Sequence, residues 1–237
     1  MELNTIKCMD CLEYLKTLPD NSVDLVVTDP PYNVSQKTNI KYGDLNIVKN
    51  FGEWDFGFDP EPILAELKRV LKPNGQIFIF CSTEQIPQYM AIFKQSWFFR
   101  NLLVWYKTNP APRLSKTNFV FANEYILYAI NDPKTKPGQV TFNFLGHKEM
   151  HNTLITSALQ GKERLRDENH KAVHPTQKPL SILKKLIEIA SNKGDVVLDP
   201  FMGVGSTAVA CKQTGRNFVG CELDKKYCKK ANWRLKQ

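Results

Sequence analysis

Blocks of apolar residues with strand or helix spacing follow one another along most of the chain. Runs of Val, Ile, Leu and Phe that end at turns predict buried strands, and apolar residues three or four positions apart predict helices that pack on them. Strands are expected over residues 4–8, from Val23, and over 76–81, 102–106, 125–130, 196–198 and 218–221. Helices are expected over 11–18, 62–71, 84–96, 180–191, from Ser206, and in a closing basic segment. This alternation predicts an α/β fold with a doubly wound, mainly parallel sheet.

Two long segments interrupt the alternation. Residues 33–59 mix lysines with Asn, Gly and isolated aromatic residues, and residues 131–173 lack periodicity and hold seven Lys or Arg against five Asp or Glu. Loops of such length in compact domains are usually functional, and basic residues beside aromatic ones suit nucleic acid. A surface crossover with its aromatic side chains packed on the core explains 33–59 equally well. A solvated surface excursion is the alternative for 131–173, because the acids partly cancel its charge.

The strand that begins at Val23 ends abruptly in Asp29, Pro30, Pro31 and Tyr32. Two consecutive prolines remove two backbone N–H donors and fix φ, so the chain can continue neither a sheet nor a helix interior there. In an open α/β sheet the carboxyl ends of the strands line the ligand crevice. The Asp29 carboxylate, the Pro30 carbonyl and the Tyr32 ring therefore offer two acceptors and a stacking face. A planar ring with an amino group, such as a nucleobase, suits this cluster.

A glycine motif forms a second candidate site near the end of the sequence. Gly203, Gly205 and Ala208 fit G-x-G-x-x-A between a predicted strand and a predicted helix, and Glu222 ends the next strand nineteen residues after Gly203. Such glycines permit a tight turn, the helix N-terminus binds a carboxylate or phosphate, and the acid accepts hydrogen bonds from ribose. A nicotinamide-dependent dehydrogenase shares this half of the fingerprint. However, only about thirty residues follow it, too few for a second mononucleotide half.

Charge and hydropathy narrow the class of protein. The chain of 237 residues has 32 Lys or Arg against 24 Asp or Glu, a net charge of +8 that favours a polyanionic partner such as nucleic acid. No apolar run approaches the ~20 residues of a membrane span, and the N-terminus lacks the pattern of a signal peptide. These features predict a single soluble, cytoplasmic domain with no membrane partner.

Cysteine and histidine spacing bears on metal and redox chemistry. The six cysteines mostly lie in apolar patterns and are predicted to be reduced core thiols. Cys8 and Cys11 have the spacing of half a zinc or redox site, but no second such pair exists, which favours packing. The histidines form two pairs with a spacing of four that could bind a metal on helices, but neighbouring Asn, Thr, Gly and Pro favour loops. These histidines are His147, His151, His170 and His174.

Three motifs in this order resemble the β group of permuted DNA amino-methyltransferases. They are the Asp-Pro-Pro-Tyr sequence at 29–32, His-Pro-Thr-Gln-Lys-Pro at 174–179, and the glycine motif over 199–207. Residues 103–113 also resemble a segment of the cell-cycle-type adenine enzymes of this group. The likeness covers nearly all of 4–237. It implies one Rossmann-like methyltransferase domain over 1–237, with 33–59 as a loop on the DNA side and 131–173 as a small irregular target-recognition insertion.

The resemblance also implies the cofactor and its contacts. S-adenosyl-L-methionine is the expected cofactor, and Thr176, Gln177 and Lys178 are expected at its methionine end. Residues expected around its methionine and ribose parts are Asp199, Phe201, Gly203, Gly205, Thr207 and Glu222. Asp10 is expected near the adenine of the cofactor, although Met9 stands where many members of the group have Gly. No metal is expected.

The expected reaction is methylation of the adenine N6 amino group in duplex DNA at specific sites. The expected catalytic residues are Asp29, Pro30, Pro31 and Tyr32, and the target base must leave the duplex to reach them. Cytosine N4 methylation is the nearest alternative, although that branch more often has Ser where this chain has Asp29. RNA or protein amide methylation is a second alternative, for which related enzymes tend to have Asn at this position. A non-catalytic DNA-binding relative is a third.

The expected partner is double-stranded DNA, which implies association with the nucleoid. Arg164 and Arg166 are expected to read bases, while lysines bind the phosphate backbone. The complete set of expected DNA-binding residues is Lys37, Lys41, Lys49, Arg113, Lys134, Lys136, Arg164 and Arg166. The sequence leaves open a homodimer and a cognate restriction enzyme.

Overall fold

The computed structural model describes most of the chain. It covers residues 1–33, 57–112, 117–136, 138–159, 163–174 and 176–237, together with the backbone of 39–42 and 45–48. Its main sheet has the strand order β1-β10-β9-β2-β5-β7-β6-β8. The strands are β1 (Thr5–Lys7), β2 (Val23–Thr28), β5 (Leu71–Cys81), β6 (Phe98–Lys107), β7 (Asn123–Ile130), β8 (Thr153–Thr156), β9 (Val196–Asp199) and β10 (Asn217–Cys221).

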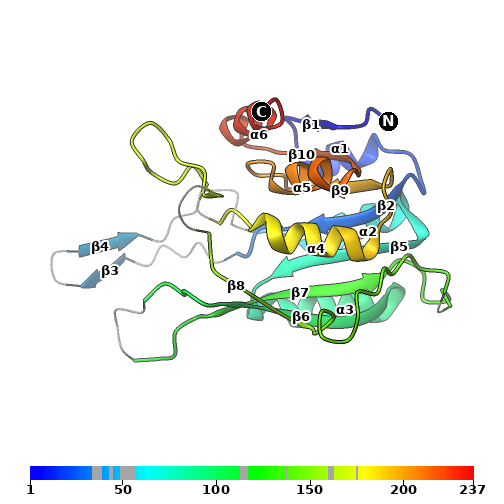
Figure 1. The fold of residues 1–237 in the computed structure, drawn as a ribbon, viewed down its shortest axis with the longest axis horizontal. Coiled ribbons are helices and arrows are strands. Elements are labelled where there is room, and N and C mark those ends of the chain that lie inside the picture. Colours follow the sequence, from blue (N-terminus) through cyan, green and yellow to red (C-terminus); the bar gives the residue numbers. More distant parts are fainter. Residues whose placement is uncertain are drawn as a thin grey trace.

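Of these eight strands, only β7 runs antiparallel to its neighbours. Helices cover both faces of the sheet, as Figure 1 shows. One face carries α1 (Cys11–Lys16), α2 (Pro60–Val70) and α3 (Ile86–Ser96), and the other carries α4 (Leu180–Ala190), α5 (Ser206–Thr214) and α6 (Lys225–Arg234). The prediction of a doubly wound, mainly parallel α/β sheet is confirmed.

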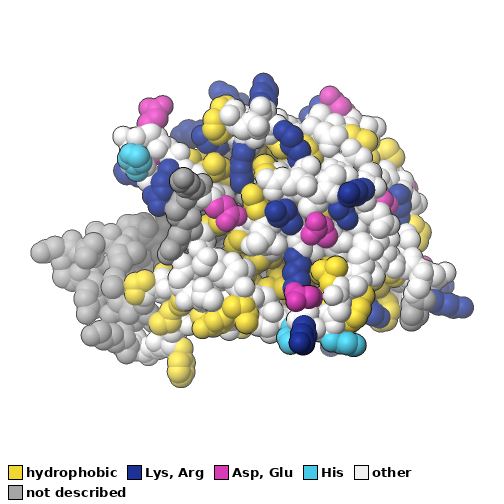
Figure 2. All heavy atoms as spheres, viewed as in Figure 1, with side chains coloured by type: hydrophobic (Ala, Val, Ile, Leu, Met, Phe, Trp, Pro, Cys, Tyr) yellow, Lys and Arg dark blue, Asp and Glu magenta, His cyan; other side chains and the backbone are white. Residues whose placement is uncertain are grey.

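Two hydrophobic layers hold this arrangement together. The alternating side chains of the central strands point to opposite faces, so that Leu25 and Val27 join one core cluster while Val26 joins the other. All three side chains are fully buried, as expected for a strand covered by helices on both faces. Lys and Arg side chains are spread over the outer surface of the face that α4, α5 and α6 cover (Figure 2).

The segment 33–59 leaves the sheet after β2 and contains a small antiparallel hairpin, β3 (Asn39–Tyr42) with β4 (Leu45–Val48). Two reciprocal hydrogen bonds close its base: Asn33 Nδ2 donates to the Phe58 carbonyl at 3.0 Å, and the Phe58 N–H donates to Asn33 Oδ1 at 2.9 Å. The other residues of the predicted DNA-side loop largely fall outside the described ranges. Three DNA-binding candidates lie outside the described residues: Lys37 and Lys49 in this loop, and Arg113 further along the chain. The side chain of Lys41 is not described either.

The segment 131–173 contains one strand of the main sheet, while its role in target recognition stays a prediction. Because β7 runs antiparallel, it delivers Asn131 to the amino-terminal edge of the parallel strands, where the N–H groups of Asn131 and Asp132 donate to the carbonyls of Gly75 and Pro73 at 2.9 and 3.0 Å. The chain then returns through β8, a strand that the sequence pattern did not predict, which adds to the edge of the sheet and buries Leu154. Residues 163–174 then lie at the edge of the sheet where the parallel strands have their carboxyl ends.

The cysteines also differ from the prediction. Cys8, which directly follows β1, forms a disulfide with Cys228 of α6, so the expectation of six reduced thiols is wrong for this pair. The two residues are 220 positions apart in the sequence, and only the packing of α6 near β1 brings them together. Cys81, Cys211 and Cys221 are buried and free, and Cys11 is free and partly exposed.

The described ranges contain neither a membrane-spanning helix nor a metal cluster. None of the helices in these ranges is long and apolar enough to cross a bilayer. Within the same ranges, His, Cys, Asp and Glu side chains form no group of three or more with the arrangement of a metal site.

Candidate active site

A pocket of about 370 Å³ opens at the carboxyl edge of the sheet between β2 and β9. The chain leaves β2 toward β5 on one side and leaves β9 toward β10 on the other, so the loops after these strands diverge. This divergence creates the crevice in which doubly wound sheets bind ligands. The pocket is lined by Asp29–Tyr32, by His174 and Thr176–Lys178, and by the glycine turn, so the structure brings the three sequence motifs together.

The turn after β2 presents a carboxylate and a ring to the pocket. Lys178 forms an ion pair with Asp29 Oδ2, whereas Asp29 Oδ1 is buried and accepts no hydrogen bond from the residues that the structure describes. Gln85, at the start of α3, donates from Nε2 to the Pro31 carbonyl at 2.8 Å. This contact fixes the double-proline turn against the neighbouring strand loop. Asp29 therefore keeps one unengaged acceptor oxygen at the pocket.

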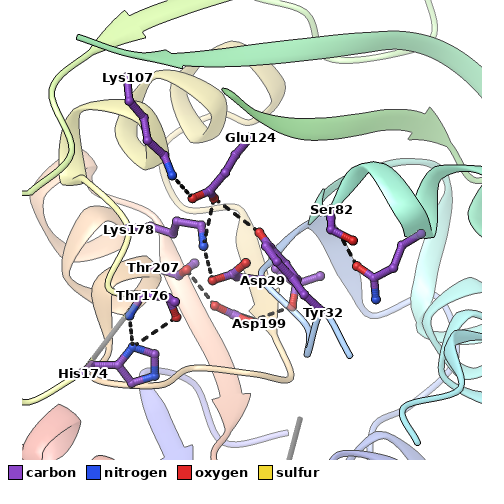
Figure 3. Close-up of polar contacts among 12 residues, drawn as sticks. Asp29, Tyr32, Ser82, Lys107, Glu124, His174, Thr176, Lys178, Asp199 and Thr207 are labelled. Atoms are coloured by element: carbon purple, nitrogen blue, oxygen red, sulfur yellow. Dashed lines mark hydrogen bonds and ion pairs between the residues drawn. The ribbon is translucent and has the colours of Figure 1, made fainter. Parts of the chain in front are cut away.

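Asp29 belongs to a cluster of buried charges, shown in Figure 3. The Lys178 ammonium also lies 3.3 Å from Glu124 Oε2, and Lys107 lies 2.5 Å from Glu124 Oε1. The Tyr32 hydroxyl donates to Glu124 Oε2 at 3.4 Å. The sequence did not identify Glu124 and Lys107 as site residues, although both lie at the ends of predicted strands. The cluster thus contains two carboxylates and two ammonium groups.

Burial and neighbouring charges shift the titration of this cluster. Burial raises the pKa of Asp29, an effect that the Lys178 ammonium opposes. Burial disfavours the charged form of Lys178, but the carboxylates of Asp29 and Glu124 outweigh this and raise its pKa. Burial also disfavours the charged form of Glu124, yet Lys178 and Lys107 lower its pKa below the ordinary value. Lys178 and Glu124 are therefore both charged at neutral pH.

Asp199, at the end of β9, stabilises the glycine turn through buried hydrogen bonds. Its Oδ1 accepts hydrogen bonds from Thr28 Oγ1 at 2.8 Å and the Phe201 N–H at 3.0 Å, and its Oδ2 accepts one from Thr207 Oγ1 at 2.7 Å. Burial raises the pKa of Asp199 to about 6, although these hydrogen bonds oppose the shift. The contacts of both Asp199 and Thr207 are thus internal. Their contact with the cofactor stays a prediction.

The glycines of the turn are required by backbone conformation and by space. Gly203 and Gly205 have φ values of +52° and +78°, in the left-handed region that favours glycine. A Cβ at Gly205 would lie 3.0 Å from the Cβ of Ala231, and a Cβ at Gly203 would lie 3.4 Å from His174 Nε2. The turn can therefore pack close to α6 only with glycine at Gly205.

Glu222, at the end of β10, faces the same turn. Its Oε2 accepts a hydrogen bond from the Gly203 N–H at 2.7 Å, and its Oε1 accepts one from the Asp224 N–H at 2.8 Å. Burial raises the pKa of Glu222. After the adjacent strand β1, Asp10 Oδ1 caps α1 by accepting from the N–H groups of Leu12 and Glu13. Both carboxylates line the pocket, and their contacts with the cofactor stay predictions.

His174 is a pocket residue whose role the sequence left open. Its ring packs against Tyr227 with centroids 4.6 Å apart, and its Nδ1 accepts a hydrogen bond from the Thr176 N–H at 3.3 Å. Burial lowers the pKa of His174 to about 4, so the ring is neutral and its proton is on Nε2. Of the four histidines, all within the described residues, only His174 lines the pocket.

Gln177 connects the pocket to the 163–174 segment. Its Nε2 donates to the Glu163 carbonyl at 3.0 Å, and its Oε1 accepts from the Leu165 N–H at 3.1 Å. This segment carries Arg164 and Arg166, which therefore lie at the same edge of the sheet as the pocket. Arg166 Nη1 donates to the His170 carbonyl at 2.6 Å within a short turn closed by a bridge to Ala172.

Two other candidates for DNA contacts are elsewhere. Lys134 and Lys136 are on the loop that follows β7, which leaves the sheet beside Gly75 and Pro73, whereas Asp29 follows the carboxyl end of β2. Figure 1 shows this loop and the carboxyl end of β2 at opposite edges of the sheet. The prediction that they bind the same duplex as the pocket does not fit this position. The two lysines lie at this edge because β7 runs antiparallel to its neighbours, a direction that the sequence pattern does not reveal.

The pocket fits S-adenosylmethionine by its chemistry. Phe201, Met202, Leu223 and Tyr227 give apolar surface for a nucleobase, while Asp10 and Glu222 offer acceptors for hydroxyl and amino groups. The volume lies in the range of small-molecule pockets. The glycine turn at the start of α5 allows a close approach to the backbone. These residues therefore fit a nucleoside with an amino-acid tail.

Comparisons with known proteins agree with this geometry. Residues 23–232 match the family described as DNA methylase, which covers N6 and N4 enzymes. The chain is 36% identical to the Type II methyltransferase M.HinfI of Haemophilus influenzae, over 99% of this chain and 69% of that protein. It is 32% identical to the Type II methyltransferase M2.DpnII of Streptococcus pneumoniae, over 95% of this chain and 87% of that protein.

Solved structures give the same assignment. The structure of the M1.HpyAVI complex with S-adenosylmethionine superposes with a TM-score of 0.71 at 31% identity, covering 98% of this chain and 99% of that chain. The PvuII cytosine-N4 DNA methyltransferase superposes with a TM-score of 0.75 at 17% identity, covering 99% of this chain and 89% of that chain, a likeness of fold alone. The predicted DNA amino-methyltransferase family and its cofactor are confirmed, while membership of the β group stays a prediction. The chain belongs to the N6/N4 DNA methylase family of S-adenosylmethionine-dependent DNA methyltransferases.

Proposed function

We propose that this chain is a β-group enzyme that methylates the N6 amino group of adenine at specific sites in duplex DNA. The observation that carries the proposal is Asp29, a residue that lines the pocket and whose buried Oδ1 has no hydrogen bond from the described residues. An acceptor in this state costs free energy unless a ligand donor satisfies it. An exocyclic amino group is such a donor. The aspartate at this position, where N4 enzymes more often have Ser, favours adenine over cytosine.

The residues of the turn act together on the target amino group. Its nitrogen lone pair is delocalised into the adenine ring and is a poor nucleophile. Hydrogen bonds from the two N–H groups to the Asp29 carboxylate and the Pro30 carbonyl favour a pyramidal nitrogen, with its lone pair available for in-line attack. The bound cofactor would supply a methyl group on a positive sulfur, which would leave as a neutral thioether while the nitrogen takes the methyl group and gives up one proton. The Tyr32 ring stacks on the base after it leaves the duplex.

The test is the identity of the methylated base. Duplex DNA is incubated with the protein and labelled S-adenosylmethionine, digested to nucleosides and separated. N6-methyladenine is the expected product. Recovery of N4-methylcytosine would instead assign the nearest alternative, and tight duplex binding with no labelled base would assign a non-catalytic DNA-binding relative.

We propose that Arg164 and Arg166 contact the DNA, whereas Lys134 at the opposite edge does not. Their segment is anchored to the pocket through Gln177. Arg164→Ala or Arg166→Ala is expected to relax the preference at a base position by about 1–3 kcal/mol. Lys134→Ala is the matched control, with unchanged duplex affinity expected. Competition binding with substituted duplexes measures both, and equal site discrimination in both arginine variants would remove base reading from this segment.

The finer expectations on partners stay predictions. These are the homodimer, the cognate restriction enzyme and the association with the nucleoid. The side chains of Lys37, Lys41, Lys49 and Arg113 belong with them, because they lie beyond the part of the chain whose side chains are described.

A further inference from the structure

We propose that Lys178 is a positioning residue that fixes the charge and the orientation of Asp29, and that Glu124 holds Lys178 in place. This inference deepens the adenine methylation proposed above and rests on it. It differs from what the resemblance implies, which is that Lys178 binds the methionine end of the cofactor. The surroundings of the ammonium group decide between the two roles.

The Lys178 ammonium is enclosed by groups of the protein itself. Only 6% of the side chain is exposed, and the ammonium lies between Asp29 Oδ2 and Glu124 Oε2. The rings of Tyr32 and Phe80 flank it, with 5.3 Å from Nζ to each centroid. Two of the three ammonium donors serve these buried carboxylates, and a shift of the ammonium toward the cofactor carboxylate would weaken both ion pairs. Lys178 is therefore placed to serve Asp29.

The ion pair distinguishes the two oxygens of Asp29. Lys178 binds Oδ2, whereas Oδ1 accepts no hydrogen bond within the described residues. The carboxylate thus has one oxygen fixed by the protein and one available to the target amino group. Because the bond to Lys178 restricts rotation of the carboxylate, it also directs the available oxygen. Lys178 therefore sets the acceptor geometry without touching the base.

Glu124 gives Lys178 a second anchor and is itself fixed. Lys107 holds Glu124 Oε1 at 2.5 Å, and the Tyr32 hydroxyl donates to Oε2 at 3.4 Å. Lys107 and Glu124 come from the paired strands β6 and β7, so the rigid sheet supports this end of the cluster. Glu124 keeps the ammonium beside Oδ2 and connects the stacking ring to the same cluster. Asp29 and Tyr32 are thus positioned by one set of charges.

The charges that face Asp29 have opposite effects on its ionisation. Burial and the Glu124 charge disfavour the carboxylate, while Lys178 and a hydrogen bond from the Tyr32 hydroxyl favour it. Tyr32 of the same turn, Asp199 after β9 and Cys81 of β5 also face this group, and the Cys81 thiol is uncharged because burial raises its pKa to about 12. Loss of the Lys178 charge should therefore raise the pKa of Asp29, whereas loss of the Glu124 charge should lower it. A purely structural role for either residue gives no reason for shifts of opposite sign.

The experiment compares Lys178→Met and Glu124→Gln with the wild-type enzyme. Measurements are kcat, the pH profile of kcat/KM on duplex DNA, and the Kd for S-adenosylmethionine. Asp29 can pair with Lys178 through Oδ2 and accept from the target amino group through Oδ1 only when it is ionised. The acid limb of kcat/KM therefore reports the titration of Asp29 in the free enzyme. Lys178→Met is expected to lower kcat roughly 100-fold, to move the acid limb up by about one pH unit, and to change the Kd less than about twofold. Glu124→Gln is expected to move the limb to lower pH.

Two further variants control for folding and for charge. Lys72→Met removes a lysine that pairs with Asp24 at 2.5 Å on the opposite edge of the sheet, and its kinetics should equal those of the wild type. Lys178→Arg keeps the positive charge and should keep the wild-type acid limb. If Lys178→Met does not fold, Lys178→Gln, which retains a hydrogen-bond donor, takes its place in the same measurements.

The inference is overturned if Lys178→Met weakens cofactor binding tenfold or more while the acid limb stays in place, since Lys178 would then serve the cofactor. It is also overturned if the two variants shift the limb in the same direction or not at all. The proposed function fails separately, when the wild-type product is N4-methylcytosine. Opposite shifts measured on cytosine would still support the role of Lys178 and Glu124.

Discussion

Replacing Asp29 by alanine is expected to abolish methyl transfer to DNA while the Kd for S-adenosylmethionine stays within a few-fold of the wild-type value. Asp29 supplies an unengaged carboxylate oxygen, and it is the one carboxylate among the described pocket residues that has a fully buried oxygen without a hydrogen bond. Loss of one preorganised electrostatic partner of a reacting group typically lowers kcat by roughly 10²–10³-fold. Cofactor contacts are expected from the glycine turn and Glu222, which this substitution leaves intact.

Turnover with labelled cofactor and equilibrium binding of the cofactor measure the two effects separately. Because alanine leaves the buried Lys178 with Glu124 as its one carboxylate partner, Asp29→Asn, which keeps the shape of the side chain, is the second variant. Asp20→Ala is the control, since Asp20 is an exposed surface partner of Arg69. Near wild-type turnover in the alanine and asparagine variants would exclude Asp29 from catalysis.

The parts of the site that the sequence predicted are those encoded by contiguous residues. The strand that ends in Asp29 could be identified because a run of Val and Leu leads directly into two prolines. The glycine turn could be identified because Gly203 and Gly205 lie between a strand pattern and a helix pattern, and their positive φ values agree with that context. Local chemistry and local backbone conformation coincide at both places.

The residues that the sequence did not reveal depend on which strands pair. Glu124 and Lys107 form an ion pair because β6 and β7 are antiparallel neighbours, a fact absent from either strand alone. The same direction of β7 moved Lys134 to the far edge. The disulfide between Cys8 and Cys228 likewise arises from contact between the first strand and the last helix. Hydrophobic periodicity indicates that a strand is buried, but not the direction in which it runs.

Replacing Glu222 by alanine is expected to weaken the binding of S-adenosylmethionine by roughly 1.5–3 kcal/mol, the value of a hydrogen bond to a charged group. The carboxylate ends β10 at the edge of the pocket, where ribose hydroxyls can donate to it. It also accepts the N–H groups of Gly203 and Asp224, so its removal frees the glycine turn to move. Both effects lower the affinity for the cofactor.

Calorimetric titration with the cofactor measures the loss, which corresponds to an increase in Kd of about ten- to a hundredfold. Glu222→Gln keeps one acceptor oxygen and should fall between the wild type and the alanine variant. Glu188→Ala is the control, because Glu188 is an exposed residue on α4 and should leave the Kd unchanged. If Glu222→Ala binds the cofactor with wild-type affinity, the ribose is held elsewhere, and the carboxylate serves only to fix the backbone of the glycine turn.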